Sequence, residues 1–232
     1  REGCLECIAV LLQAGADMVL AQGSTDEQRA SIEAIAGALQ DGRLDEAACV
    51  RSAQRIDALA ERFPIQQRPY AAVQRAADEL LMRQACARAL TALRGAMPPS
   101  GPLRVITQQT VDSDGVSESG LSAEGVASLW DAGADIDWLR VPDLMSLRSE
   151  QIPRDGRTNV LVSNQRARYL LPARHWPIDL QLAIWNPFHA LDLPAPTLVS
   201  WGYDQPMRDA LRAWLAGGVG APGHAPVRAL EN

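Results

Sequence analysis

The first quarter of the chain places apolar residues three and four positions apart, the spacing of amphipathic helices. This pattern predicts helices over residues 4–14, about 25–40 and about 45–63, with Thr25 or Asp26 capping the second. Between the first two, residues 17–21 form a short apolar run that we expect to be a buried strand. A single strand makes no sheet, so this segment is expected to pack on further structure.

The remainder of the chain alternates short apolar runs with helical patterns. Two prolines bracket a boundary at 64–69, a long helix is predicted over about 70–94, and a proline-rich connector follows. Five strands are then predicted, at residues 103–107, 136–141, 159–163, 180–185 and 197–201. Helices are predicted at 122–132, 143–149 and 205–215. This alternation predicts an α/β fold, a mainly parallel five-stranded sheet with helices on both faces.

Composition removes several classes of protein. With 47% hydrophobic residues in 232, the chain is no disordered segment. No apolar run approaches the roughly 20 residues that a membrane span requires. The 28 acidic and 22 basic residues give a net charge of −6, which argues against a nucleic-acid partner.

Sequence motifs argue against nucleotide chemistry and against a serine hydrolase triad. The first predicted strand lacks the G-x-G-x-x-G spacing of dinucleotide folds, and a P-loop needs a lysine, which the chain lacks. A G-x-S-x-G nucleophile motif is also missing. Cys4 and Cys7 form a C-x-x-C without a nearby histidine pair, so we interpret them as small apolar residues of a helix. We expect no cofactor and no metal.

An acidic loop is the best candidate site that the pattern itself offers. Asp112, Asp114 and Glu118 follow the first predicted strand of the sheet, and open α/β sheets bind ligands outside the carboxyl ends of their strands. Paired carboxyl groups are what glycoside hydrolysis requires. Asp-Ser-Asp-Gly is equally ordinary turn chemistry, so both interpretations stay open.

Several segments in order resemble glycoside hydrolase family 3. GADMVL at 15–20, GRLDEA at 42–47 and RSAQRI at 51–56 resemble the end of that family's catalytic barrel. NPF at 186–188, WGY at 201–203 and APGHAPV at 221–227 resemble its second domain. The layout, with a short α/β domain, is most similar to the bacterial β-N-acetylglucosaminidase branch.

This resemblance implies an organisation and an activity. Residues 1–64 would be the last strand and helices of a (β/α)8 barrel, 65–102 a linker and long connecting helix, and 103–232 an αβα sandwich. The parent enzyme would remove terminal β-linked N-acetylglucosamine from cell-wall or chitin-type oligosaccharides by a retaining mechanism. Its K-H-F-P-G-H-G-d loop and Asp nucleophile would lie upstream of Arg1. We therefore assign no catalytic residue here and expect the chain alone to be inactive.

Substrate contacts are expected from three residues. Gln22 follows a predicted barrel strand, at the end where barrel enzymes line their sites, and Asp114 and Glu118 lie in the acidic loop. In the β-glucosidase branch the second domain supplies the acid, for which Glu118 is the candidate.

Partners follow from the same resemblance. They would be a carbohydrate, bound through the full-length parent, and the chain's own missing barrel. Apolar residues left exposed in the barrel remnant would drive dimer contacts or aggregation, namely Ile8, Leu11, Leu12 and Val19. The alternative is a non-catalytic Rossmann-like binding or interaction module. The compartment stays open, with the bacterial cytoplasm slightly favoured.

Overall fold

A computed structural model describes residues 2–21, 23–65, 69–111 and 119–230 of the chain. The chain divides into two compact units, a helical unit up to Pro69 and a sheet unit from Tyr70 onward. Each unit has its own hydrophobic core. Among the described residues, no helix has the length and apolar composition needed to span a bilayer.

The helical unit consists of three helices around a small core. These are α1 (Glu2–Gln13), α2 (Thr25–Gln40) and α3 (Glu46–Arg62). Ala9, Ala38 and Leu44 are its buried centre. The three helices lie where the apolar periodicity predicts them, within two residues at each end. The predicted cap of α2 is wrong, because Ser24 caps it: its Oγ accepts from Glu27 N at 3.3 Å, and Glu27 Oε2 accepts from Ser24 N at 2.8 Å.

The predicted strand at residues 17–21 does not form. Met18 is 70% and Leu20 89% exposed, and within the described helical unit no second strand offers hydrogen bonds. Side chains of α3 fix this segment instead. The Asp17 carboxylate accepts hydrogen bonds from Ser52 Oγ at 2.8 Å and Arg55 Nε at 2.9 Å. The Arg55 guanidinium and the Ser52 hydroxyl lower the pKa of Asp17 to about 2.

The apolar residues exposed in this unit differ partly from the predicted set. Ile8 is buried at 8% exposure, so the prediction that its side chain is exposed is wrong. Leu12 and Val19 are half-buried, and Leu11 is exposed as predicted.

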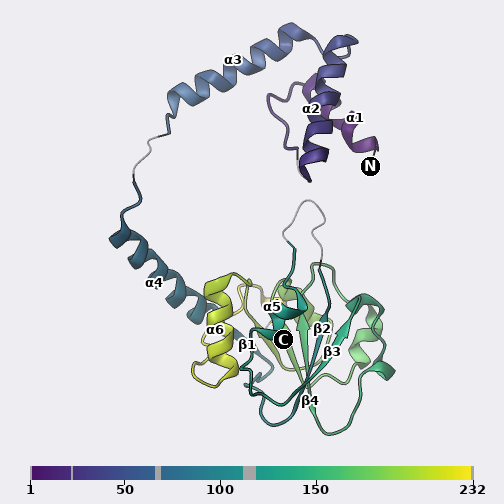
Figure 1. The fold of residues 1–232 in the computed structure, drawn as a ribbon, viewed down its shortest axis with the longest axis vertical. Coiled ribbons are helices and arrows are strands. Elements are labelled where there is room, and N and C mark those ends of the chain that lie inside the picture. Colours follow the sequence, from purple (N-terminus) through teal and green to yellow (C-terminus); the bar gives the residue numbers. More distant parts are fainter. Residues whose placement is uncertain (1, 22, 66–68, 112–118, 231–232) are drawn as a thin grey trace. The chain divides into compact units, whose positions relative to one another are not determined.

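The sheet unit is a six-stranded, mostly parallel sheet with helices, which confirms the predicted α/β class (Figure 1). The strand order is β1-β6-β5-β4-β2-β3, and only β1 runs antiparallel to its neighbour. In chain order the strands and helices are α4 (Ala72–Ala89), β1 (Thr91–Leu93), β2 (Leu103–Gln108), α5 (Ala123–Ala127), β3 (Ile136–Val141), β4 (Thr158–Ser163), β5 (Leu180–Ala183), β6 (Thr197–Val199) and α6 (Gln205–Leu215).

The sixth strand, β1, corrects the predicted helix over 70–94. The helix ends at Ala89, and the next residues pair with β6 in the register Thr91 to Val199. Local sequence does not separate the two outcomes, since a short apolar run suits a buried strand as well as a helix. Without β1, β6 would be an edge strand with unpaired backbone groups. Because residues 91–93 supply hydrogen-bond partners for those groups, they form a strand and not a helix.

The two faces of the sheet are covered differently. The first face packs against α4, α5 and α6, and Figure 1 shows α6 beside the end of α4. The second face carries the short 3₁₀ helices η1 (Leu144–Ser146), η2 (Ser149–Gln151), η3 (Leu171–His175) and η4 (Pro187–Leu191). The predicted helix at 143–149 is wrong, because two short 3₁₀ helices occupy this segment. The helix α5 forms but is shorter than the predicted 122–132. Pro142 and Pro153 bracket η1 and η2, and proline removes the backbone N–H groups that a longer helix would need.

Leu211 anchors α6 on the first face with no exposed surface. We expect Leu211→Ala to lower the free energy of unfolding of the sheet unit by about 2–5 kcal/mol, because the cavity cannot close fully. Urea unfolding followed by tryptophan fluorescence measures this, since all six tryptophans lie in the sheet unit.

The matched control is Arg212→Ala on the same helix. Its ion pair to Asp131 is 3.9 Å long between exposed side chains, so its loss should change stability by less than about 1 kcal/mol. Equal losses for the two variants would contradict the packing described for α6.

Candidate functional site

The candidate site lies where the strand order reverses. The chain passes from β2 to β3 on one side and then returns to β4 on the other side of β2. At such a switch point the two connections leave in opposite directions, and the carboxyl ends of the strands border a crevice. The loop after β2 and the residues directly after β4 meet there.

Hydrogen bonds fix both ends of the loop after β2. Gly120 N donates to Val111 O at 3.0 Å, and Ala123 N donates to Gln109 O at 3.2 Å. These residues, together with Leu121 and Asn164, form what we call the loop neck.

Asn164 joins this neck to β4. It follows the last residue of β4 and has no exposed surface. Its Oδ1 accepts from Leu121 N at 3.0 Å, and its Nδ2 donates to Leu121 O. One buried amide thereby satisfies both backbone groups of a residue 43 positions away.

Gly120 allows the close approach at the neck. A Cβ atom on Gly120 would lie 2.8 Å from Val111 Cβ and 2.9 Å from both Asn164 O and Asn164 Oδ1. Two of these atoms belong to the buried amide and its backbone, so neither can move aside cheaply. The position therefore requires glycine.

An aromatic pair lies on the neighbouring connections. Trp185 follows β5 and Tyr203 follows β6, and their ring centroids are 5.5 Å apart at 59°. Tyr203 Oη donates to Ser119 O at 3.2 Å, just outside the neck. Partly exposed rings beside convergent polar groups are the usual lining of small-molecule sites.

The structure does not test the site residues predicted from sequence. Gln22, Asp112, Asp114 and Glu118 all lie outside the described residues. What is described is the base from which the acidic loop extends. Cys7 is exposed on α1, and the described residues contain no group of three or more His, Cys, Asp or Glu placed to hold a metal ion.

Sequence analysis missed the residues of the neck. A polar residue directly after a buried strand is the only signal for Asn164, and many such residues have no further role. Gly120 carries no local signal, because its constraint comes from side chains of other segments.

His189 on η4 is the most buried titratable group near this edge. It has no exposed surface, its Nε2 donates to Ala167 O at 2.7 Å, and its ring lies 4.7 Å from that of Tyr169. Burial lowers the pKa of His189, since the charged form loses hydration. A neutral histidine that donates to a backbone carbonyl stabilises the connection before β6.

We expect Gly120→Ala to reduce the stability of the sheet unit by about 1–3 kcal/mol, because the new Cβ overpacks the neck. Gly133→Ala is the matched control, as its Cβ would meet nothing within 4 Å. The control should be neutral or slightly stabilising through the unfolded chain. Urea unfolding compares the two, and an unperturbed Gly120→Ala would contradict the close approach.

We expect the stability of the sheet unit to fall as the pH drops below about 6.5. The unfolded chain binds a proton at His189 in this range and the folded chain resists it, so the slope is positive and at most about 1.4 kcal/mol per pH unit for one group. His189→Asn should remove this component, whereas His175→Gln at an exposed position should keep it. Identical pH profiles for wild type and His189→Asn would show that His189 does not titrate differently on folding.

Comparison with known proteins identifies the fold. No family model matches the sequence, and no curated protein does either. Among solved structures, a glycoside hydrolase family 3 β-N-acetylglucosaminidase from Paenibacillus sp. str. FPU-7 matches 97% of this chain and 48% of its own, with 18% identity and a TM-score of 0.56.

Two further structures are similar. A fungal multi-domain family 3 β-N-acetylglucosaminidase matches 97% of this chain and 29% of its own, with 18% identity and a TM-score of 0.57. The β-glucoside phosphorylase BglX matches 96% of this chain and 45% of its own, with 17% identity and a TM-score of 0.50. The chain thus spans half or less of each structure. The resemblance predicted from sequence is confirmed as a likeness of fold: nearly the whole chain folds like part of a family 3 glycoside hydrolase.

Proposed function

We propose that this chain is the C-terminal portion of a family 3 glycosidase that removes terminal β-linked N-acetylglucosamine from cell-wall or chitin-type oligosaccharides. The observation that carries the proposal is the match over 97% of the chain, through the helical segments and the sheet together, to a β-N-acetylglucosaminidase structure. In this proposal residues 1–64 are the C-terminal end of a (β/α)8 barrel. Residues 65–102 connect the barrel to the second domain, which residues 103–232 form.

The chemistry divides between this chain and the barrel in a defined way. Retaining hydrolysis needs a nucleophile and an acid/base group, in the common case about 5 Å apart on either side of the bond. We assign both to the barrel, outside these residues, so the chain alone is inactive. This chain contributes substrate contacts from Gln22, Asp114 and Glu118. The loop neck holds the ends of the segment that carries the last two.

The first test compares the activity of this chain with that of the protein encoded by the complete reading frame. We expect no turnover of 4-nitrophenyl β-N-acetylglucosaminide by the chain. The coding sequence upstream should encode a K-H-x-P-G-H-G loop and a later Asp, and its full product should hydrolyse the substrate with retention, seen by proton NMR of the first-formed anomer. Turnover by the chain alone, or a start codon just before Arg1, would contradict the proposal and favour a non-catalytic module.

The second test assigns the roles of the acidic loop in that full-length product. As substrate contacts, Glu118→Gln and Asp114→Asn should each raise KM on diacetylchitobiose about fivefold, the loss of roughly one hydrogen bond, with kcat nearly unchanged. A fall in kcat of about 10²–10⁴ for Glu118→Gln alone would make it the general acid instead, as in the β-glucosidase branch. The 4-nitrophenyl substrate should then be much less affected, because its leaving group needs little protonation.

A further inference from the structure

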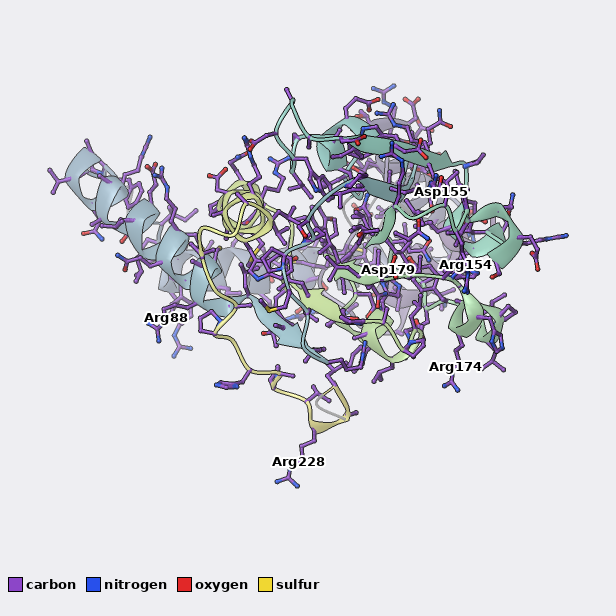
Figure 2. All side chains as sticks on the ribbon, turned by 90° about the horizontal axis from the view of Figure 1, so that it is seen from below. Arg88, Arg154, Asp155, Arg174, Asp179 and Arg228 are labelled. Carbon is purple, nitrogen blue, oxygen red and sulfur yellow. The ribbon has the colours of Figure 1, made fainter. Side chains whose placement is uncertain are left out.

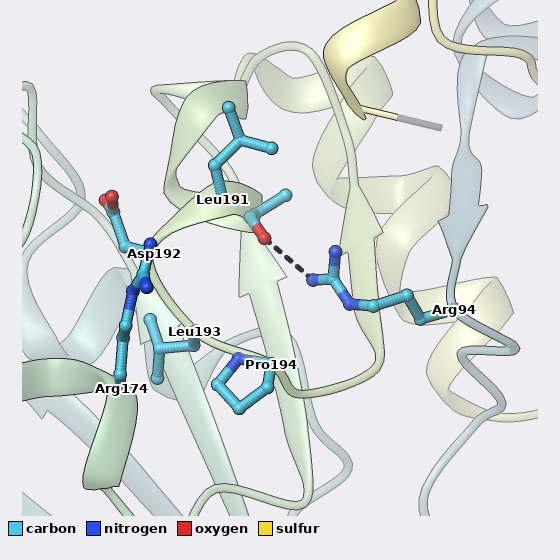
Figure 3. Close-up of a pocket in the computed structure, with 7 residues that line it drawn as sticks. Arg94, Arg174, Leu191, Asp192, Leu193 and Pro194 are labelled. Atoms are coloured by element: carbon cyan, nitrogen blue, oxygen red, sulfur yellow. Dashed lines mark hydrogen bonds between the residues drawn. The ribbon is translucent and has the colours of Figure 1, made fainter. Parts of the chain in front are cut away.

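A pocket lies at the other end of the parallel strands from the loop neck. It has a volume of about 270 Å³ and is lined by Arg94, Arg174 and residues 190–194 (Figure 3). Arg94 follows β1 and bonds to Thr197, the first residue of β6, so this pocket borders the amino ends of the parallel strands. We call it the two-arginine pocket.

Arg94 is held rigidly at one wall of this pocket. It occupies a turn in which Ala96 N donates to Leu93 O at 3.2 Å, and its φ of 52° is unusual for a residue other than glycine. Its Nε donates to Ala195 O at 2.9 Å, and its Nη2 donates to Ala190 O at 2.8 Å and to Thr197 Oγ1 at 2.7 Å. All three acceptors are neutral, and Nη1 has no partner among the described residues.

The Arg94 guanidinium therefore has no counter-charge among the residues that the structure describes. Arg94 is exposed as a whole residue, and the partial burial of its side chain lowers the pKa of Arg94. A partly buried guanidinium without a counter-charge gains most from an oxyanion placed against its free N–H groups. A strained backbone that holds such a group is a common feature of binding sites.

The opposite wall adds a second cation, and the one acid in the pocket is already neutralised. Arg174 on η3 is exposed and has no hydrogen bond or ion pair with any other described residue. Asp192 also lines the pocket, but its carboxylate accepts from Arg168 Nε at 2.8 and 2.9 Å and from Tyr169 N at 3.0 Å. The pocket thus keeps a net positive charge in a chain whose net charge is −6.

The rest of the lining is apolar. Ala190, Leu191, Leu193 and Pro194 complete the pocket. A strongly hydrated inorganic anion would lose water against these side chains without compensation. A carboxylate attached to a small apolar body would satisfy the guanidinium groups and cover the leucines and the proline.

From this combination we propose that the two-arginine pocket binds a small monocarboxylate with an apolar body. Its carboxylate lies between Arg94 and Arg174, and its apolar part rests on Leu191, Leu193 and Pro194. The site is separate from the loop neck and does not depend on the glycosidase proposal.

Titration of the full 232-residue chain by NMR tests this with three probes. Benzoate should shift the Arg94 Nε–H signal and the methyl signals of Leu191 and Leu193 in a saturable way. Benzamide, which has the same body without the charge, should bind at least about tenfold more weakly. Inorganic phosphate, with charge but no apolar body, should also bind at least tenfold more weakly. Equal binding of benzamide or of phosphate would overturn the proposal, as would absence of a benzoate response.

Arg174→Ala supplies the matched variant, because Arg94 also supports the fold. It should weaken benzoate binding about tenfold and leave thermal unfolding unchanged. Arg88→Ala on α4 is the control for general charge, since Figure 2 shows Arg88 and Arg174 far apart on the unit. An equal effect of the two substitutions would mean that the unit attracts anions non-specifically, which would also overturn the assignment.

Discussion

The sheet unit depends on a buried polar network that holds irregular chain against the second face. Gln181, in the middle of β5, donates from Nε2 to Ser163 Oγ at 2.8 Å and to His189 O at 3.2 Å, and its Oε1 accepts from Thr197 Oγ1 at 3.0 Å. An unpartnered buried amide would cost about 1–3 kcal/mol, so the network stabilises only when complete. Short 3₁₀ helices bring few backbone hydrogen bonds of their own, and side chains replace them.

The same network connects the two edges of the sheet. Arg94 joins it at Thr197, by the amino end of β6, and Ser163 lies directly before Asn164, at the carboxyl end of β4. The loop neck and the two-arginine pocket are thus built on opposite ends of the same strands. The strands between the two ends are buried and closely packed. This arrangement separates the two proposed sites and gives both a fixed base.

Elements whose stability is local could be predicted from the sequence. The helix α6 was predicted with its observed bounds, and its stability is local: the structure shows Asp204 capping it and one apolar face buried. Strands β2 to β6 were predicted from buried runs between turns. Elements set by distant partners could not be predicted: β1 depends on the edge of β6, and residues 17–21 would need a neighbouring strand. The neck at Gly120 and Asn164 could not be predicted for the same reason, because its hydrogen bonds and close contacts join segments more than forty residues apart.

The neck also changes how the acidic loop should be understood. By sequence alone, Asp-Ser-Asp-Gly is an ordinary turn, and its carboxylates need no function. An ordinary turn, however, does not need a buried asparagine that binds both backbone groups of Leu121. Nor does it need glycine at a position where any Cβ atom would collide with three other atoms. Groups that contact a substrate have to be held to within about half an ångström, which requires a rigid support. The support is observed at the switch point of the sheet, where ligands of such folds bind. The packing of the neck, more than the acidic residues themselves, therefore favours a binding role for this loop.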